Sequence, residues 1–249
     1  MSVEGKVVLI TGAARGLGME YARSLGAAGA RIVAGDVLDC DAAAEAAGNG
    51  ALAVRLDVTD IASADAMAEL AMEAFGRIDA LINNAALYGS LRGGRFNTIA
   101  EADWDAAMAV NVKGIWNCCK AVVPAMRQSG GGSIINVASL AATYGMPFAL
   151  HYTTSKAAVI GLTRGLAREL GRDNIRVNAL APSAVMTEGT AEFFGDKLER
   201  GLEVIRSSQS IQRTLEPADL TGTVTWLVSD ASRFVTGQTI AVDGGTVML

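Results

Sequence analysis

Short runs of β-branched and aliphatic residues alternate along the chain with longer alanine-rich segments. The runs lie at residues 6–10, 31–35, 52–56, 78–82, 133–138, 175–180 and 239–242. Apolar residues at helical spacing fill the intervening segments 16–28, 41–47, 61–75, 101–127, 152–170 and 217–228. Strands that alternate with helices of this length form βαβ units. The sequence therefore predicts a seven-stranded parallel sheet in a doubly wound α/β fold, with helices on both faces.

The composition favours one large core over several small ones. The 249 residues fit a single α/β domain over 1–249, and the chain carries neither an internal repeat nor a linker. Hydrophobic residues make up 51% of the chain and charged residues 19%, which suits a parallel sheet buried on both faces. The formal net charge of −5 provides no basic face for nucleic acid.

Targeting and cysteine patterns indicate the cytoplasm. The N-terminal residues lack a basic stretch followed by an apolar one, so we expect no signal peptide. No run approaches the ~18 apolar residues of a membrane helix, so we expect no membrane insertion. Cys40, Cys118 and Cys119 have neither the pairing of a disulfide framework nor the spacing of a zinc site, and we expect no metal.

One segment departs from the rhythm of strands and helices. Residues 187–213 form a long polar and aromatic stretch before the last predicted helix. An insertion of this length in a compact domain is typical of a lid or a binding loop. Ligands of an open parallel sheet bind beyond the carboxyl ends of the strands, where the strand order reverses. We therefore expect functional residues just after each strand.

A glycine-rich turn follows the first strand, with the letters TGAARGLG. Gly12, Gly16 and Gly18 have the spacing G-x-x-x-G-x-G, which differs from the dinucleotide fingerprint G-x-G-x-x-G. Glycines allow a tight turn and a close approach to a pyrophosphate, and the N-terminus of the following helix favours the anion. The pattern by itself fits either a phosphate-binding loop or an ordinary glycine-rich turn.

An acidic residue ends the second strand, about 20 residues after the glycine turn, where a ribose-binding acid is found in dinucleotide sites. Asp36 would accept hydrogen bonds from the adenosine ribose and repel a 2′-phosphate, which favours NAD over NADP. A solvated loop acid is the other interpretation. Arg15 lies inside the glycine turn, and we expect it to pair with Asp36 rather than with a phosphate. Asp57 ends the third strand and is placed to bond the adenine amino group.

The letters HYTTSK at 151–156 contain the chain's one histidine, a tyrosine and a lysine. Tyr152 and Lys156 are four residues apart and therefore share one face of a helix. A tyrosine with its ordinary pKa of ~10 is a poor base at neutral pH. A neighbouring ammonium and an oxidised nicotinamide would lower that pKa by ~3 units, which takes ~4 kcal/mol. We expect His151 to line the pocket or to pack locally rather than to transfer protons.

Taken in order, these motifs resemble the short-chain dehydrogenase/reductase family over essentially the whole chain. The matching elements are TGAARGLG, the acidic end of the second strand, LDV at 56–58, NNAA at 83–86, Asn111, Ser139, Tyr152 with Lys156, APSAVMT at 181–187 and VDGG at 242–245. The resemblance implies a Rossmann-type fold and hydride transfer between a secondary alcohol and a ketone. It places the cofactor, NAD in this chain, against Gly12, Arg15, Gly16, Leu17, Gly18, Asp36, Asp57, Val58, Asn84, Ala85, Tyr152, Lys156, Pro182, Val185 and Thr187.

The resemblance also assigns roles in the reaction. Tyr152 is the general base in alcohol oxidation and the general acid in ketone reduction. Lys156 lowers the pKa of Tyr152 and holds the nicotinamide ribose. Ser139 bonds the substrate oxygen, and Asn111 is similar to the asparagine that holds a relay water. Ser183 stands where the family commonly has a glycine, which puts the local backbone geometry beside the nicotinamide in doubt.

The expected substrate pocket is largely apolar and aromatic. It consists of Ser139, Leu140, Tyr144, His151, Tyr152, Met186 and Phe193. The segment APSAVMT and the C-terminal letters GQTIAVDGGTV are similar to phenylethanol dehydrogenases, which act on aryl secondary alcohols. We therefore expect a neutral alcohol with an aromatic or bulky apolar group, and the matching ketone. Phe193 fits equally a role in seating the lid, and Arg92 and Arg95 fit equally an anionic substrate or a solvated loop.

Three other functions fit parts of the pattern. A reductase of 3-oxoacyl chains on a carrier protein, or a dehydrogenase of an anionic hydroxy acid, would share the fold, but carrier-protein reductases usually need NADP and a basic face. A non-catalytic NAD-binding regulator is disfavoured because the reactive set of four residues is complete. We also expect a homotetramer, because the helices 101–127 and 152–170 carry more apolar and small residues than one sheet face can cover.

Overall fold

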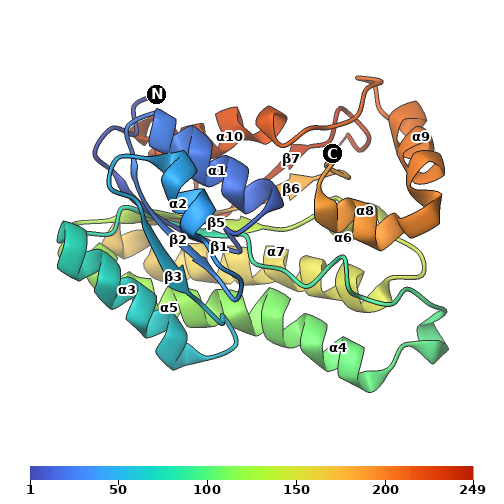
Figure 1. The fold of residues 1–249 in the computed structure, drawn as a ribbon, viewed down its shortest axis with the longest axis horizontal. Helices are drawn as coiled ribbons and strands as arrows, with labels where there is room; N and C mark the ends of the chain where they lie inside the picture. Colours follow the sequence, from blue (N-terminus) through green and yellow to red (C-terminus); the bar gives the residue numbers. More distant parts are fainter. Residues whose placement is uncertain (249) are drawn as a thin grey trace.

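A computed structural model of the chain describes residues 1–248; residue 249, the last of the predicted domain, lies outside the described range. At its centre is one sheet of seven parallel strands, as the sequence predicts (Figure 1). The strands are β1 (Val7–Thr11), β2 (Arg31–Asp36), β3 (Leu52–Arg55), β4 (Ala80–Asn83), β5 (Gly132–Val137), β6 (Ile175–Pro182) and β7 (Thr239–Val242). They lie in the order β3-β2-β1-β4-β5-β6-β7. Each predicted strand is present, and only its ends differ.

Helices cover both faces of the sheet (Figure 1). One face carries α1 (Gly16–Ala27), α2 (Asp41–Ala47) and α10 (Ala218–Val228), and the other carries α3 (Ile61–Phe75), α5 (Gly114–Gln128) and α7 (Leu150–Leu170). Side chains of a strand alternate between the faces, so Val8 and Ile10 pack toward α1 while Val7 and Leu9 pack toward α3 and α5. All four are at most 1% exposed. Burial on both faces explains why the strand segments read as continuous apolar runs.

The strand order reverses between β1 and β4. β1 pairs with β2 on one side and with β4 on the other, and all of these strands run parallel. The loops that leave the carboxyl ends of β1 and β4 therefore diverge to opposite faces and open a crevice between them. The glycine turn and the segment NNAA both lie at this crevice, where the sequence predicts the ligand site.

The segment predicted as one helix over 101–127 is interrupted in the structure. α4 (Glu101–Met108) and α5 are joined by a π-helical turn at Ala109–Lys113. A π turn holds one residue more than an α-helical turn, and such turns are frequent at functional sites. The extra residue turns buried Asn111 toward the loop after β4, where its side chain bonds the backbone of Leu87. Periodicity alone could not show this interruption, because the flanking helices continue in nearly the same direction (Figure 1).

The predicted lid at 187–213 is mostly helical. It contains α8 (Glu188–Phe194) and α9 (Leu198–Ser208), which lie together beyond the carboxyl ends of the strands (Figure 1). The remaining short helices are α6 (Ala141–Tyr144) and 3₁₀ turns at Phe96–Thr98, Gly171–Asp173, Gly195–Lys197 and Asp230–Ser232. Within residues 1–248, no helix has both the length and the apolar character needed to cross a membrane.

Candidate active site

Two adjoining cavities occupy the crevice at the carboxyl ends of the strands. The glycine-loop cavity, of about 410 Å³, extends from Gly12 to the end of β2 at Asp36. The Tyr152 cavity, of about 440 Å³, lies beneath α8 and α9. Both cavities are walled in part by Leu17, Asn84, Ala86, Tyr88 and Thr187. They therefore form one continuous cleft that extends from Asp36 at the end of β2 to Tyr152.

The glycine turn brings the backbone of β1 close to the loop after β4. Gly12 has φ +66°, and a Cβ there would lie 2.7 Å from the Cα of Ala85. A Cβ on Gly18 would lie 2.1 Å from the carbonyl oxygen of Gly12. The amide of Asn84 donates to the carbonyl oxygens of Thr11 (3.1 Å) and Gly12 (2.9 Å), which holds the two loops together. The N-terminus of α1 opens onto this cradle, so the site fits the pyrophosphate of a dinucleotide.

Asp36 lies at the end of β2 with both carboxylate oxygens facing backbone donors. Its Oδ2 accepts from the N–H of Ala14 and its Oδ1 from that of Leu38, each at 3.1 Å. The predicted pairing of Arg15 with Asp36 is wrong, because Arg15 forms a two-pronged ion pair with Glu192 of α8 instead. Sequence reasoning could not find Glu192, which lies in a lid whose fold over the glycine turn is a tertiary feature.

The other residues expected at the cofactor line one of the two cavities or support it. Gly12, Arg15, Gly16, Leu17, Asp36, Asp57, Val58, Asn84, Ala85 and Thr187 line the glycine-loop cavity, and Tyr152, Lys156, Pro182 and Val185 line the Tyr152 cavity. Gly18 packs beneath the turn against Gly12. Asp57 accepts two hydrogen bonds from Thr59 at its Oδ1, and these bonds lower the pKa of its carboxyl. An ionised Asp57 remains placed for the predicted bond to an adenine amino group.

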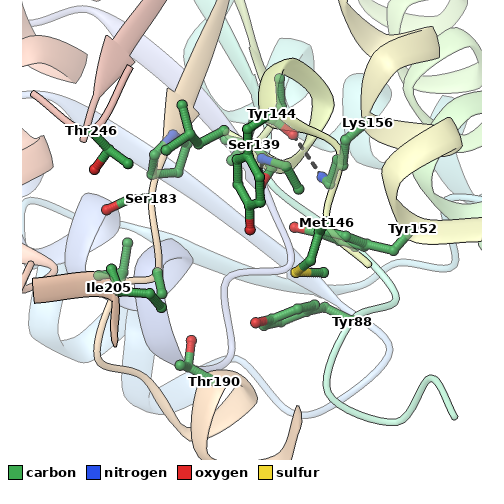
Figure 2. A pocket seen from close by; sticks show the side chains of 18 of the residues that line it. Tyr88, Ser139, Tyr144, Met146, Tyr152, Lys156, Ser183, Thr190, Ile205 and Thr246 are labelled. Atoms are coloured by element: carbon green, nitrogen blue, oxygen red, sulfur yellow. Dashed lines mark hydrogen bonds between the residues drawn. The ribbon is translucent and has the colours of Figure 1, made fainter. Parts of the chain in front are cut away.

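The expected reactive residues converge on the Tyr152 cavity. Tyr152 is 8% exposed and Lys156 is 2% exposed, and both lie on one face of α7. The Nζ of Lys156 lies 5.8 Å from the centre of the Tyr152 ring and donates to the carbonyl oxygen of Val137 at 2.7 Å (Figure 2). Ser139 follows β5, and its Oγ accepts from the N–H of Ala141 at 3.1 Å. Ser139, Tyr152 and Lys156 all line this cavity.

Burial controls the protonation of this pair. It raises the pKa of the Tyr152 phenol to about 12, and an interaction with the Ser139 side chain opposes part of that rise. It lowers the pKa of the Lys156 ammonium to about 8. The lowered phenol pKa predicted from the sequence concerns the enzyme with oxidised nicotinamide bound, and it stays a prediction. The loss of solvent around the Tyr152 phenol is the largest influence on its pKa, and the Lys156 ammonium, 5.8 Å from the ring centre, does not offset it.

Asn111 connects two loops beneath the cleft. Its Oδ1 accepts from the N–H of Leu87 at 2.7 Å, and its Nδ2 donates to the carbonyl oxygen of Leu87 at 3.2 Å. The same Nδ2 donates to the Oγ of Ser155 at 3.0 Å, one residue before Lys156. The side chain therefore ties the loop after β4 to α7. Its predicted role in holding a relay water stays a prediction.

Four of the seven expected substrate residues line the Tyr152 cavity: Ser139, Leu140, Tyr144 and Tyr152. The other three lie outside its walls. His151 is fully buried, with its Nδ1 accepting from the N–H of Tyr152. Met186 is 41% exposed, and Phe193 stacks on Tyr88 with ring centres 4.6 Å apart. The burial of His151 and the outward orientation of Met186 depend on tertiary packing, which their positions in the sequence do not show.

Several residues of the cavity were missed by sequence reasoning. Val204, Ile205 and Ser208 of α9, Thr190 of α8, Met146, and Thr246 and Val247 near the C-terminus complete its walls. Figure 2 shows Ile205, Ser183 and Thr246 on the side of the cavity opposite Tyr152, Met146 and Tyr88. A helical spacing of apolar residues over 198–208 could have indicated α9. Ser183 also bonds the buried side chain of Gln209 at 3.2 Å, which anchors the end of the lid.

Comparison with known proteins agrees with this geometry. A family model described as enoyl-(acyl carrier protein) reductase matches residues 12–247. A 3-oxoacyl-[acyl-carrier-protein] reductase of Thermotoga maritima is 40% identical over 100% of both chains. The chain belongs to the short-chain dehydrogenase/reductase family. It is an oxidoreductase of a family that binds a nicotinamide cofactor.

Relatives with different named substrates are nearly as similar. A 3-alpha-(or 20-beta)-hydroxysteroid dehydrogenase of Mycobacterium bovis is 39% identical, covering 98% of this chain and 90% of its own. The crystal structure of a 3-ketoacyl-(acyl-carrier-protein) reductase from Brucella melitensis, complexed with NADH, superposes with a TM-score of 0.91 at 33% identity. That match covers 98% of this chain and 99% of the other. The comparisons therefore identify the family, whereas the substrates named for these relatives differ.

Proposed function

We propose that the protein is an NAD-dependent secondary alcohol dehydrogenase and ketone reductase whose substrate is neutral and carries an aromatic or bulky apolar group. The observation that carries the proposal is the chemistry of the Tyr152 cavity. Among the described residues that line it, Lys156 is the one charged side chain, and it is already bonded to Val137. Arg92 and Arg95, the candidates for binding an anionic substrate, are exposed and lie outside these walls.

An apolar substituent gains free energy in this cavity and a carboxylate loses it. The walls are formed mainly by aliphatic and aromatic groups such as Leu140, Met146, Val185 and Ile205. A phenyl group that loses about 100 Å² of exposed surface gains about 2.5 kcal/mol, at about 25 cal/mol per Å². A carboxylate in the same place would lose its hydration and find one ammonium, that of Lys156, which already donates to the carbonyl oxygen of Val137. This difference supports a neutral substrate.

The proton transfer is assigned to the chain's own residues. A bound nicotinamide cofactor would accept the hydride in oxidation and donate it in reduction. Tyr152 takes the hydroxyl proton in alcohol oxidation and returns it to the carbonyl oxygen in ketone reduction. Ser139 hydrogen-bonds the substrate oxygen beside Tyr152. Lys156 places a positive charge near the Tyr152 ring and binds the nicotinamide ribose. α8 and α9 exclude water from the reacting carbon.

NAD is the proposed cofactor because of the charge at the end of β2. Asp36 lines the glycine-loop cavity, and its carboxylate would accept from ribose hydroxyls and repel a 2′-phosphate. The NADH complex of the B. melitensis relative is consistent with this choice. The cytoplasm is part of the proposal, supported by three free, buried cysteines, a state that suits a reducing compartment.

A 3-oxoacyl thioester reductase is the second candidate, favoured by the T. maritima relative. A decisive experiment measures kcat/KM with NAD for 1-phenylethanol and for a short 3-hydroxy acid, and with NADH and NADPH for acetophenone and a 3-oxoacyl thioester. We expect the aryl alcohol and ketone to be preferred and NAD to exceed NADP by at least about tenfold, or ~1.4 kcal/mol. Faster turnover of the acid, lost in Arg92→Ala or Arg95→Ala, would refute the apolar pocket. Preference for the thioester with NADPH would support the second candidate.

A further inference from the structure

An ion pair joins the glycine turn to the lid across the mouth of the cofactor site. Arg15 lies in the loop between β1 and α1, and Glu192 lies in α8. Nη1 of Arg15 donates to Oε1 of Glu192, and Nη2 donates to Oε2 at 3.1 Å. This fork-to-fork arrangement occupies two donors of the guanidinium on the edge that a phosphate would use.

Arg15 is the one cationic side chain among the described residues that line the glycine-loop cavity. The other charged groups in those walls are Asp36, Asp57 and Glu188. A cofactor that carries a 2′-phosphate at the ribose end of this cavity has no other cation from the walls to neutralise it. Whether the Arg15 guanidinium is free to bind the 2′-phosphate therefore determines how much more weakly this cavity binds a cofactor that carries it.

The position of Glu192 depends on a glycine in the facing loop. A Cβ on Gly89 would lie 2.5 Å from Oε2 of Glu192 and 2.9 Å from the carbonyl oxygen of Gly189. Gly89 lines the same cavity as Arg15. The absence of a side chain at this position gives the carboxylate room to reach across to the guanidinium.

We propose that Glu192 is a specificity-determining residue, which holds the Arg15 guanidinium away from a 2′-phosphate and so reinforces Asp36 in favouring NAD. The proposal rests on the NAD preference argued above. Glu192 acts through Arg15 and is a positioning residue, since its carboxylate does not itself line the cavity. The side chains of Arg15 and Glu192 are 48% and 44% exposed, so solvent screens the pair. We therefore expect a contribution of a few-fold, secondary to that of Asp36.

The test measures dissociation constants of NADH and NADPH by fluorescence titration for wild type, Glu192→Gln, Arg15→Gln and the double variant. Glu192→Gln is expected to improve NADPH binding relative to NADH by about two- to fivefold, the range for a solvent-screened ion pair. The gain should be absent when Arg15 is Gln. It should also shrink in about 1 M salt, where the Debye length is about 3 Å.

Glu188→Gln is the matched control, because Glu188 lines the cavity beside Arg15 but does not pair with it. Its expected effect on the ratio is smaller than that of Glu192→Gln. Glu192→Ala should act in the same direction as Glu192→Gln. An unchanged ratio in Glu192→Gln, an equal gain in Glu188→Gln, or a gain that persists without Arg15 would overturn the proposal.

Failure of the inference and failure of the proposed function give different results. If wild type binds NADPH as tightly as NADH, the NAD preference itself is wrong, and the role assigned to Glu192 falls with it. If wild type prefers NADH and Glu192→Gln leaves the ratio unchanged, the role of Glu192 alone is wrong. Asp36→Ala would then still be expected to reduce the preference.

Discussion

Removal of the Ser139 hydroxyl should move the pH dependence of the reaction to higher pH. Burial raises the pKa of Tyr152 to about 12, and the interaction with Ser139 holds it below the value that burial alone would give. Ser139→Ala deletes that interaction, so the phenol pKa rises further. Alcohol oxidation requires the phenolate, and its rate increases with pH up to this pKa. The rising limb of the oxidation profile therefore shifts upward in the variant.

The size of the shift follows from the burial of Tyr152. Hydrogen bonds to charged groups contribute about 1.5–3 kcal/mol, and one pKa unit corresponds to about 1.4 kcal/mol. Tyr152 is 8% exposed, so water can replace little of the lost interaction. We expect the limb to move by about 1 to 2 pH units. The positive charge of bound oxidised nicotinamide lowers the phenol pKa in both proteins, which brings the limb into the measurable range, and the difference between them remains.

The assay is kcat/KM for oxidation of 1-phenylethanol with NAD from about pH 6 to about pH 11, with the reduction of acetophenone measured over the same range. The fall of the reduction rate at high pH should shift upward by the same amount. Ser183→Ala is the matched control, because its hydroxyl lines the same cavity but bonds Gln209. The position of the limb is the readout, since loss of substrate positioning lowers the rate at every pH. If the rising limbs of the oxidation profiles of Ser139→Ala and wild type lie at the same pH, Ser139 does not lower the pKa of Tyr152.

Three further predictions concern the proton donor, the glycine turn and the assembly. Tyr152→Phe should reduce kcat by at least about 100-fold while the NADH dissociation constant stays within about twofold, and a variant that keeps more than about a tenth of kcat would refute the assignment. Gly18→Ala should lower the free energy of unfolding by about 1–3 kcal/mol in urea, because its Cβ would meet the Gly12 carbonyl at 2.1 Å. Gly222→Ala, in the middle of α10 with nothing within 4 Å of its Cβ, should instead raise it by about 0.5–1 kcal/mol. Sedimentation at micromolar concentration should show a homotetramer of four 25.7 kDa chains, and a monomer alone would contradict the predicted assembly.

The sheet was predictable because each strand carries its own local pattern. In the runs 6–10 and 31–35, successive apolar side chains pack into opposite helical layers, as expected for a strand buried on both faces. The order of the motifs then located the cleft, since each one follows a strand. Asp36 and the glycine turn, distant in sequence from Tyr152, meet there because parallel strands share one carboxyl edge.

The contacts within the cleft were less predictable, because they depend on how separate segments approach one another. The burial of His151 follows from the rotation of α7, and the outward orientation of Met186 follows from the path of the loop after β6. The pKa of Tyr152 without cofactor could not be predicted either. The sequence shows that an ammonium is four residues away, and it does not show the burial that outweighs it.

α8 links the two halves of the cleft, which bears on how cofactor and substrate specificity evolve. Within its seven residues, Thr190 lines the Tyr152 cavity, Glu192 binds Arg15 of the glycine turn, and Phe193 stacks on Tyr88. The Tyr88 ring in turn lies 4.9 Å from that of Tyr152. A substitution that shifts this helix therefore changes the surroundings of Arg15 and of the reacting tyrosine together. Selection for a larger substrate through α8 should thus alter the choice between NAD and NADP, even though no cofactor-binding residue has changed.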